Sequence, residues 1–241
     1  MAHMEIVSLV RQLGRRRFPP AISALPGARC PVQSHPVRPR VVQISAAPVL
    51  PARALFARLD ALTSSPPGDR AALAVQLRDP ELPTRALVDL GTRLRRRTRA
   101  LGAGLVVNDR LDLALALGAD GVHLGRRSIR VADARALLGA GAWISVACHG
   151  VEDVVRAASE GADAASLSPI FASPGKGALL GLGALEDARA ALATRGLSLQ
   201  IIALGGVDME RAPACFSAGA DAVAAIRADL TAALAARGHH R

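Results

Sequence analysis

From Val41 onward, short apolar runs alternate with longer Ala-, Leu- and Arg-rich segments of helical spacing. Such alternation predicts a series of strand–helix units. The tripeptide Gly-Ala-Asp recurs at residues 118, 161 and 219, each time between a predicted helix and the next predicted strand. Because glycine at a helix end can adopt the left-handed conformation that stops the helix, three copies of this junction predict three copies of one strand–helix module.

Eight strands are predicted, at Val41–Ala47, Ala72–Arg78, Gly104–Asn108, Gly121–Leu124, Trp143–Cys148, Ala164–Ser168, Leu199–Leu204 and Ala222–Ile226. Eight helices are predicted, at Ala52–Leu62, Thr84–Leu101, Leu111–Leu117, Val131–Leu138, Val151–Glu160, Leu185–Thr194, Met209–Ala218 and Ala228–Ala236. The strands are apolar enough to be buried on both faces. Eight such units in about 200 residues predict an α/β protein, a (β/α)8 TIM barrel. A doubly wound open sheet is the alternative, but no Gly-x-Gly-x-x-Gly follows the first strand.

The charge of the chain is concentrated near its N-terminus. Of a formal net charge of +10, seven arginines and a single acid lie in residues 1–40. We expect residues 1–40 to form a basic, proline-rich extension, with residues 1–4 a vector-derived scar, and residues 41–241 to form one barrel domain. Four Phe, one Trp and no Tyr leave little aromatic surface for base stacking. Nucleic-acid binding is therefore not expected.

The remaining composition favours a cytoplasmic protein. No apolar run approaches the roughly 18 residues that a membrane-spanning helix needs, so no membrane partner is expected. The three cysteines, Cys30, Cys148 and Cys215, form an odd set without metal-ligand spacing. Neither a disulfide framework nor a zinc site is suggested, and a reducing compartment fits best. A homo-oligomer is left open.

In a TIM barrel the active site lies at the C-terminal ends of the strands. Polar or glycine residues stand at these ends in the sequence: Gln76, Arg78, Asn108, Asp109, His149, Lys176, Gly205, Gly206 and Arg227. Of the 30 Lys and Arg residues only Lys176 is a lysine. In so arginine-rich a chain, the remaining lysine is a candidate for a position that needs a compact, flexible point charge. The alternative is a surface-loop lysine that survived by chance.

Two glycines and two cations predict an anion site at this end of the barrel. Glycine lets backbone N–H groups approach a phosphate closely, and the loops after the last two strands of such barrels commonly bind one. Gly205 and Gly206 could also serve only as a tight turn. Lys176 and Arg78, expected at the same mouth, favour the anionic ligand.

The residues after the third and fifth strands have alternative roles. Asn108 or Asp109 could cap the following helix, since both are preferred N-cap residues. Asp109 could instead hold Mg²⁺ together with diphosphate oxygens and water. His149, at a strand end, is a candidate general acid or base. Its neighbour Cys148 points to the opposite side of the strand and is expected to be packed.

Four blocks of sequence resemble the thiamine phosphate synthase superfamily, which includes the TenI-type thiazole tautomerases. The blocks are Val75–Arg78; Val107–Arg110 with Ala119–Gly125; Ser168–Phe171 with Lys176; and Ile202–Val207 with Ala218–Asp221. The resemblance covers nearly all of residues 41–230. It implies a TIM barrel whose site joins a pyrimidine diphosphate to a thiazole phosphate.

The resemblance also assigns site residues, with some departures. Arg78, Asn108, Asp109 and Lys176 match the synthase residues that hold diphosphate and Mg²⁺. The positions that depart from the synthase pattern are Pro80, Ser128, Ser173, Gly175, Ala147 and Arg227. Ser128 replaces the second metal carboxylate, beside Arg126 and Arg127, and this change should weaken Mg²⁺ binding.

Three functions follow as hypotheses. The first is a TenI-like tautomerase that needs no metal: His149 moves a proton on a phosphorylated thiazole, and Lys176, Gly205, Gly206 and Arg227 hold its phosphate. The second is a thiamine phosphate synthase that couples the pyrimidine diphosphate to the thiazole phosphate, with Mg²⁺ on Asp109. The third, of another class, is a catalytically silent barrel that only binds a phosphate ligand, since fold alone does not guarantee activity.

Overall fold

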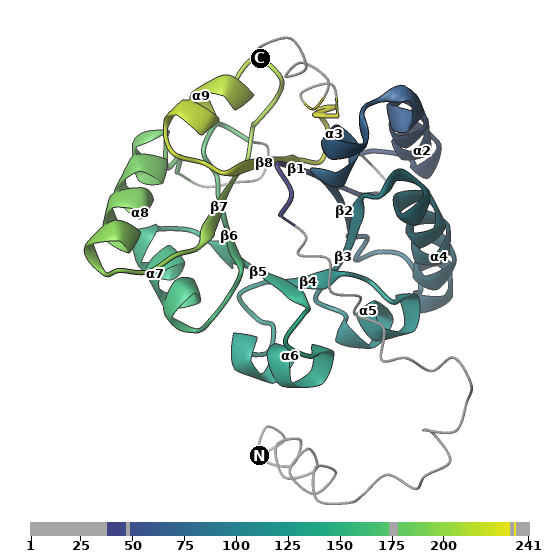
Figure 1. Ribbon diagram of the computed structural model, residues 1–241, viewed down its shortest axis with the longest axis horizontal. Helices are drawn as coiled ribbons and strands as arrows, with labels where there is room; N and C mark the ends of the chain where they lie inside the picture. Colours follow the sequence, from purple (N-terminus) through teal and green to yellow (C-terminus); the bar gives the residue numbers. More distant parts are fainter. Residues whose placement is uncertain (1–37, 47–48, 174–177, 232–233, 235–241) are drawn as a thin grey trace, which may run out of the picture. The chain divides into compact units, whose positions relative to one another are not determined.

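The computed structural model describes residues 38–46, 49–173, 178–231 and 234. Within them, eight parallel strands close into a barrel in the order β1 to β8, and helices surround it (Figure 1). The strands are β1 Val41–Ile44, β2 Leu73–Leu77, β3 Gly104–Asn108, β4 Gly121–Leu124, β5 Trp143–Cys148, β6 Ala164–Leu167, β7 Gln200–Leu204 and β8 Ala222–Ala225. The predicted (β/α)8 TIM barrel is confirmed.

The helices are α2 Ala52–Ala61, η2 Leu62–Ser64, α3 Pro67–Ala71, α4 Thr84–Leu101, α5 Leu111–Leu117, α6 Val131–Leu138, α7 Val151–Ser159, α8 Gly183–Thr194 and α9 Ala212–Ser217. Three helices and three strands have the predicted bounds. Sequence analysis missed η2 and α3. The helix predicted from Ala228 is wrong at its start, because residues 228–231 form a loop, and most of its remainder lies outside the described residues.

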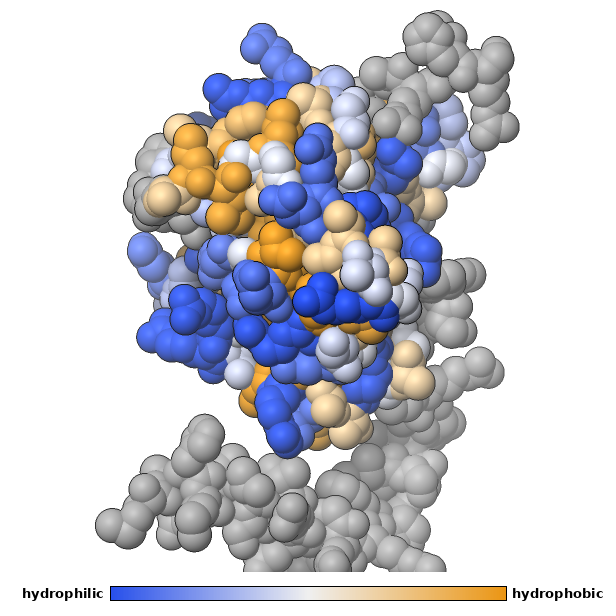
Figure 2. All heavy atoms as spheres, turned by 90° about the vertical axis from the view of Figure 1, so that its left-hand side faces the viewer, coloured by the Kyte–Doolittle hydropathy of each residue, from blue (hydrophilic) through white to orange (hydrophobic). Residues whose placement is uncertain are grey.

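The barrel strands bury both faces, as predicted. One apolar cluster fills the interior with residues from seven strands and includes Val42, Val106, Trp143 and Ile202. The alternate strand residues, such as Val75, pack with the helices in the larger outer cluster. On the side that carries α7 and α8, hydrophilic side chains surround smaller apolar patches (Figure 2). No helix among the described residues is long and apolar enough to span a bilayer.

The three Gly-Ala-Asp junctions share one structure. Gly118, Gly161 and Gly219 have positive φ angles of 55°, 81° and 96°, as the helix-stop prediction requires. Each junction aspartate then accepts a backbone N–H from the preceding strand and binds an arginine of a preceding helix. The three sets are Asp120 with Leu105 and Arg95, Asp163 with Ile144 and Arg135, and Asp221 with Ile201 and Arg189. The repeat therefore ties neighbouring strands and helices together at the N-terminal face of the barrel.

Candidate active site

The half of the barrel interior nearest the C-terminal ends of the strands, which form the mouth of the barrel, is polar. On the C-terminal side of the apolar interior cluster, alternate strand positions hold Gln76, Asn108, His123, Ser145 and Ser166. The Gln76 Nε2 group donates to Asn108 Oδ1 at 3.0 Å, and His123 Nδ1 lies 2.9 Å from Ser145 Oγ. All but Asn108 are buried. These contacts link β2 to β3 and β4 to β5, so the floor of the mouth is a set of oriented hydrogen-bonding groups.

His123 is a functional candidate to which sequence analysis assigned no role. Its ring is buried, and burial lowers its pKa to about 4, assisted by the charge of Arg78 and opposed by that of Asp109. At neutral pH the imidazole is therefore uncharged. The alternation of side chains along β4 is the signal that indicates its position. The neighbours Val122 and Leu124 point outward to the helices, so His123 between them points into the barrel.

Arg78 and Asp109 stand at neighbouring strand ends, and both act electrostatically on His123. The Arg78 main chain is held by Ser45, whose Oγ accepts from Arg78 N at 2.9 Å and donates to Arg78 O at 3.3 Å. The Arg78 side chain is half-buried and forms no ion pair with a described residue. It is thus a cation fixed at the mouth and available to an anion.

Asp109 has a left-handed backbone, with φ 62°, the one non-glycine residue of the described chain with a positive φ. Its N–H donates to His123 O at 2.9 Å, and its carboxylate is exposed. Neither Asp109 nor Asn108 caps α5, because Arg110 occupies the N-cap position without a side-chain cap. The capping alternative is therefore wrong, and the Asp109 carboxylate faces solvent at the mouth.

His149 and Cys148 point to different environments, as predicted. The His149 ring is exposed, and its Nδ1 lies 2.9 Å from Ser168 O. Since a carbonyl only accepts, Nδ1 carries the hydrogen and Nε2 of the neutral ring is left to exchange a proton. The Cys148 thiol is buried, and burial raises its pKa to about 12. Cys148 is therefore not a nucleophile.

Gly205 and Gly206 adopt φ angles of 94° and 65°. The loop after β6 lies directly against them. A Cβ on Gly205 would lie 2.8 Å from Pro169 Cα, and one on Gly206 would lie 2.5 Å from Ala172 O. The two glycines thus satisfy a tight, closely packed turn. Their N–H groups donate to no described residue, which leaves the predicted phosphate role open to them.

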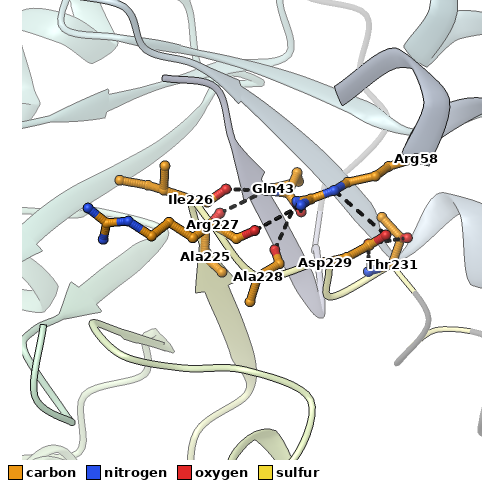
Figure 3. Close-up of polar contacts among 8 residues, drawn as sticks. All are labelled: Gln43, Arg58, Ala225, Ile226, Arg227, Ala228, Asp229 and Thr231. Carbon is orange, nitrogen blue, oxygen red and sulfur yellow. Dashed lines mark hydrogen bonds and ion pairs between the residues drawn. The ribbon is translucent and has the colours of Figure 1, made fainter. Parts of the chain in front are cut away.

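The loop after β8 is held from its outer side (Figure 3). Arg58 of α2 donates to Arg227 O at 2.8 Å and to Ala228 O at 3.0 Å. The Arg227 side chain extends on the opposite side of β8 from Arg58 (Figure 3) and is exposed. Arg227 therefore presents its guanidinium away from the contact that fixes its own backbone.

The structure leaves the predicted role of Lys176 untested and gives Ser128 a contact within its own turn. Lys176 lies outside the described residues, so its predicted role stays a prediction. Ser128, which the resemblance places at the position of the second metal carboxylate, accepts from Gly125 N at 2.7 Å and closes the turn after β4. Within the described residues no group of three or more His, Cys, Asp or Glu side chains could hold a metal. Asp109 is thus a single carboxylate that needs ligands from elsewhere to bind one.

The fold and the mouth together define a (β/α)8 barrel with a cationic, hydrogen-bonding site at the C-terminal ends of its strands. Residues 52–228 match the family model described as thiamine monophosphate synthase, and the chain belongs to this family. It is 44% identical over 167 residues to the thiamine-phosphate synthase of Methanoculleus marisnigri, covering 66% of this chain and 77% of that protein.

Further similarities agree. A thiamine-phosphate synthase of Moorella thermoacetica is 40% identical over 165 residues, which cover 67% of this chain and 76% of that one. Thiamine phosphate pyrophosphorylase from Pyrococcus furiosus superposes with a TM-score of 0.66 at 26% identity, covering 81% of this chain and 91% of that chain. The names of these proteins favour the second hypothesis, a thiamine phosphate synthase, over the first, a TenI-like tautomerase.

Proposed function

We propose that this protein is a thiamine phosphate synthase, which joins a pyrimidine diphosphate to a thiazole phosphate and releases diphosphate. The observation that carries the proposal is the position of Arg78 and Asp109 at adjacent strand ends, where the charge of each acts on His123. A cation and a carboxylate at the ends of neighbouring strands suit a diphosphate and the metal ion that it carries. The relatives with synthase names support the same reaction.

In the proposed site the diphosphate binds at the β2 and β3 ends. Arg78 would hold diphosphate oxygens, and the Lys176 ammonium would join it from the loop after β6. Gln76 and Asn108, already hydrogen-bonded to each other, would orient the pyrimidine half. Arginine and lysine at the leaving group stabilise the negative charge that grows there as the carbon–oxygen bond breaks.

Mg²⁺ fits this site only as a metal shared with the substrate. Asp109 supplies one exposed carboxylate, and Ser128 is engaged in its own turn. Mg²⁺ commonly takes one or two protein carboxylates and completes its shell with phosphate oxygens and water. Asp109 would therefore hold the ion together with the diphosphate. Bound there, Mg²⁺ would neutralise charge on the leaving group.

The thiazole phosphate would bind at the ends of β7 and β8. Gly205 and Gly206 leave their N–H groups without an acceptor among the described residues, and Arg227 carries an exposed guanidinium beside them in the barrel order. Backbone amides and a cation together are the usual ingredients of a phosphate site in TIM barrels. We assign Gly205, Gly206 and Arg227 to this half-site.

The deciding experiment supplies both substrates to the purified protein with and without Mg²⁺ and measures thiamine phosphate and diphosphate. We expect equal amounts of both products, formed only with Mg²⁺. If neither product forms while thiazole phosphate raises the melting temperature, the silent binder replaces the synthase. Retention of full activity in the presence of a chelator would exclude the role given to Asp109.

The tautomerase is kept as a second candidate because His149 has the geometry of an acid or base. Its Nδ1 contact with Ser168 O leaves Nε2 available. The matching assay follows isomerisation of a thiazole carboxylate phosphate without metal, in the wild type and in His149→Ala. Turnover that disappears in the variant supports this candidate. Under either reaction, the cytoplasmic location and a possible homo-oligomer stay predictions.

A further inference from the structure

Arg58 and Gln43 form a polar network behind the β8 loop, on the side away from the Arg227 side chain (Figure 3). Gln43 is fully buried, and its Nε2 donates to the carbonyls of Ala225 and Ile226, each at 3.1 Å. Arg58 Nη1 in turn donates to Gln43 Oε1 at 3.2 Å. The network thus joins β1, α2 and the C-terminal end of β8.

The same network binds four consecutive carbonyl groups. Gln43 takes those of residues 225 and 226, and Arg58 takes those of residues 227 and 228. The peptide bonds here are trans, and in a planar trans peptide the N–H points opposite to the C=O. The N–H groups of Arg227, Ala228 and Asp229 therefore face away from Arg58, and they donate to no residue that the structure describes.

The side that these N–H groups face is the barrel mouth. Ile226 packs against the apolar cluster of the barrel interior, and Figure 3 shows its side chain and that of Arg227 on the side opposite Arg58. Successive unpaired N–H groups in a loop form a concavity that binds anions. Arg58 is only 18% exposed, so its charge also polarises these peptides from behind.

We propose that Arg58, supported by Gln43, is a positioning residue that orients the β8-loop amides toward the phosphate of the substrate. This inference rests on the proposed function for the identity of that substrate. Arg58 itself does not touch the ligand. It acts through the carbonyls of Arg227 and Ala228, both of which its planar guanidinium group binds. The ammonium group of a lysine cannot reproduce this geometry.

The ion pair with Asp229 holds the Arg58 guanidinium group in place. Arg58 Nε lies 3.7 Å from Asp229 Oδ2. The other carboxylate oxygen, Oδ1, accepts from Thr231 N at 3.0 Å and from Thr231 Oγ1 at 2.5 Å. Asp229 thus couples the arginine to the turn that ends the loop, and Asp229→Asn weakens the attraction while it keeps an acceptor for Thr231.

The test compares Arg58→Lys with the wild type and with Arg97→Lys as the matched control. Arg97 of α4 pairs with Asp60, which lies on α2 as Arg58 does. Among the described residues, no hydrogen bond or ion pair joins Arg97 to the β8 loop. In Arg58→Lys we expect the KM for thiazole phosphate and the Kd for inorganic phosphate to rise about tenfold, the effect of one lost charge-assisted hydrogen bond. The kcat should change less than about threefold, since the reacting atoms are not touched.

The outcomes separate this inference from the proposed function. If the wild type makes no thiamine phosphate but binds inorganic phosphate tenfold better than Arg58→Lys does, the positioning role stands without the synthase. If Arg58→Lys keeps the wild-type KM and phosphate Kd, or if the wild type binds neither phosphate nor thiazole phosphate, the inference is overturned. Should Arg58→Lys fail to fold, Asp229→Asn decides instead: we expect its phosphate Kd to rise about threefold, and an unchanged Kd overturns the proposal.

Discussion

At the scale of single residues, the mouth depends on side chains whose backbone is fixed by other contacts. Asp109 is an example: its left-handed φ of 62° and its N–H contact with His123 O direct an exposed carboxylate to the mouth. Asparagine tolerates the same backbone conformation. A change in charge alone can therefore be made at this position.

We predict that Asp109→Asn lowers Mg²⁺-dependent synthase activity by about tenfold or more and raises the Mg²⁺ concentration for half-maximal rate, because the amide is a weaker ligand for a hard cation. Initial rates at several Mg²⁺ concentrations measure this effect. Asp112→Asn is the control, since Asp112 pairs with Arg110 on the surface. Equal losses in the two variants would remove Asp109 from the metal site.

At the scale of elements, the Gly-Ala-Asp junctions bind each helix to the strands beside it, with different degrees of burial. The Arg95–Asp120 side chains are only 9% and 12% exposed, whereas those of Arg189–Asp221 are 39% and 44% exposed. Loss of a buried partner leaves an uncompensated charge, but an exposed arginine is solvated by water. The three copies of one motif should therefore differ in their effect on stability.

We predict that Asp120→Ala lowers the free energy of unfolding by about 3–5 kcal/mol and Asp221→Ala by about 1–2 kcal/mol, the latter mainly through the unsatisfied N–H of Ile201. Urea denaturation of both variants measures the difference. An equal effect of the two substitutions would contradict the account based on burial.

At the scale of the whole molecule, the polar interior makes stability depend on pH. Burial lowers the pKa of His123 from 6.5 to about 4, so the unfolded chain binds the proton first as the pH falls. Stability from this group is fully present above pH 6.5, falls between about pH 6.5 and 4, and is lost below about 4. The pKa difference corresponds to about 3 kcal/mol.

The corresponding experiment measures the free energy of unfolding from pH 4 to 8 in the wild type and in His123→Gln, whose amide can still reach Ser145. We expect the wild-type curve to fall more steeply toward acid than that of the variant, by about 3 kcal/mol in total. Parallel curves would mean that His123 is not buried in its neutral form.

The sequence by itself determined the barrel and most of its elements. Helical and strand periodicity are local, since each residue's face follows from its position in the repeat, and the Gly-Ala-Asp glycines stop helices through their own backbone freedom. Candidate residues at the strand ends, such as Arg78, Asp109 and Arg227, could also be named from the sequence, because the architecture places strand ends at the mouth. Their roles in a site stay predictions. Their partners were not found.

Only the tertiary structure decided how these residues are held. Arg58 meets the carbonyls of Arg227 and Ala228 across 169 and 170 residues of sequence, and His123 meets Ser145 only where β4 lies beside β5. The first contact arises when the barrel closes and β8 pairs with β1, and the second when β4 pairs with β5. No local pattern specifies them, because their geometry depends on the relative position of distant elements rather than on the spacing of residues within one element.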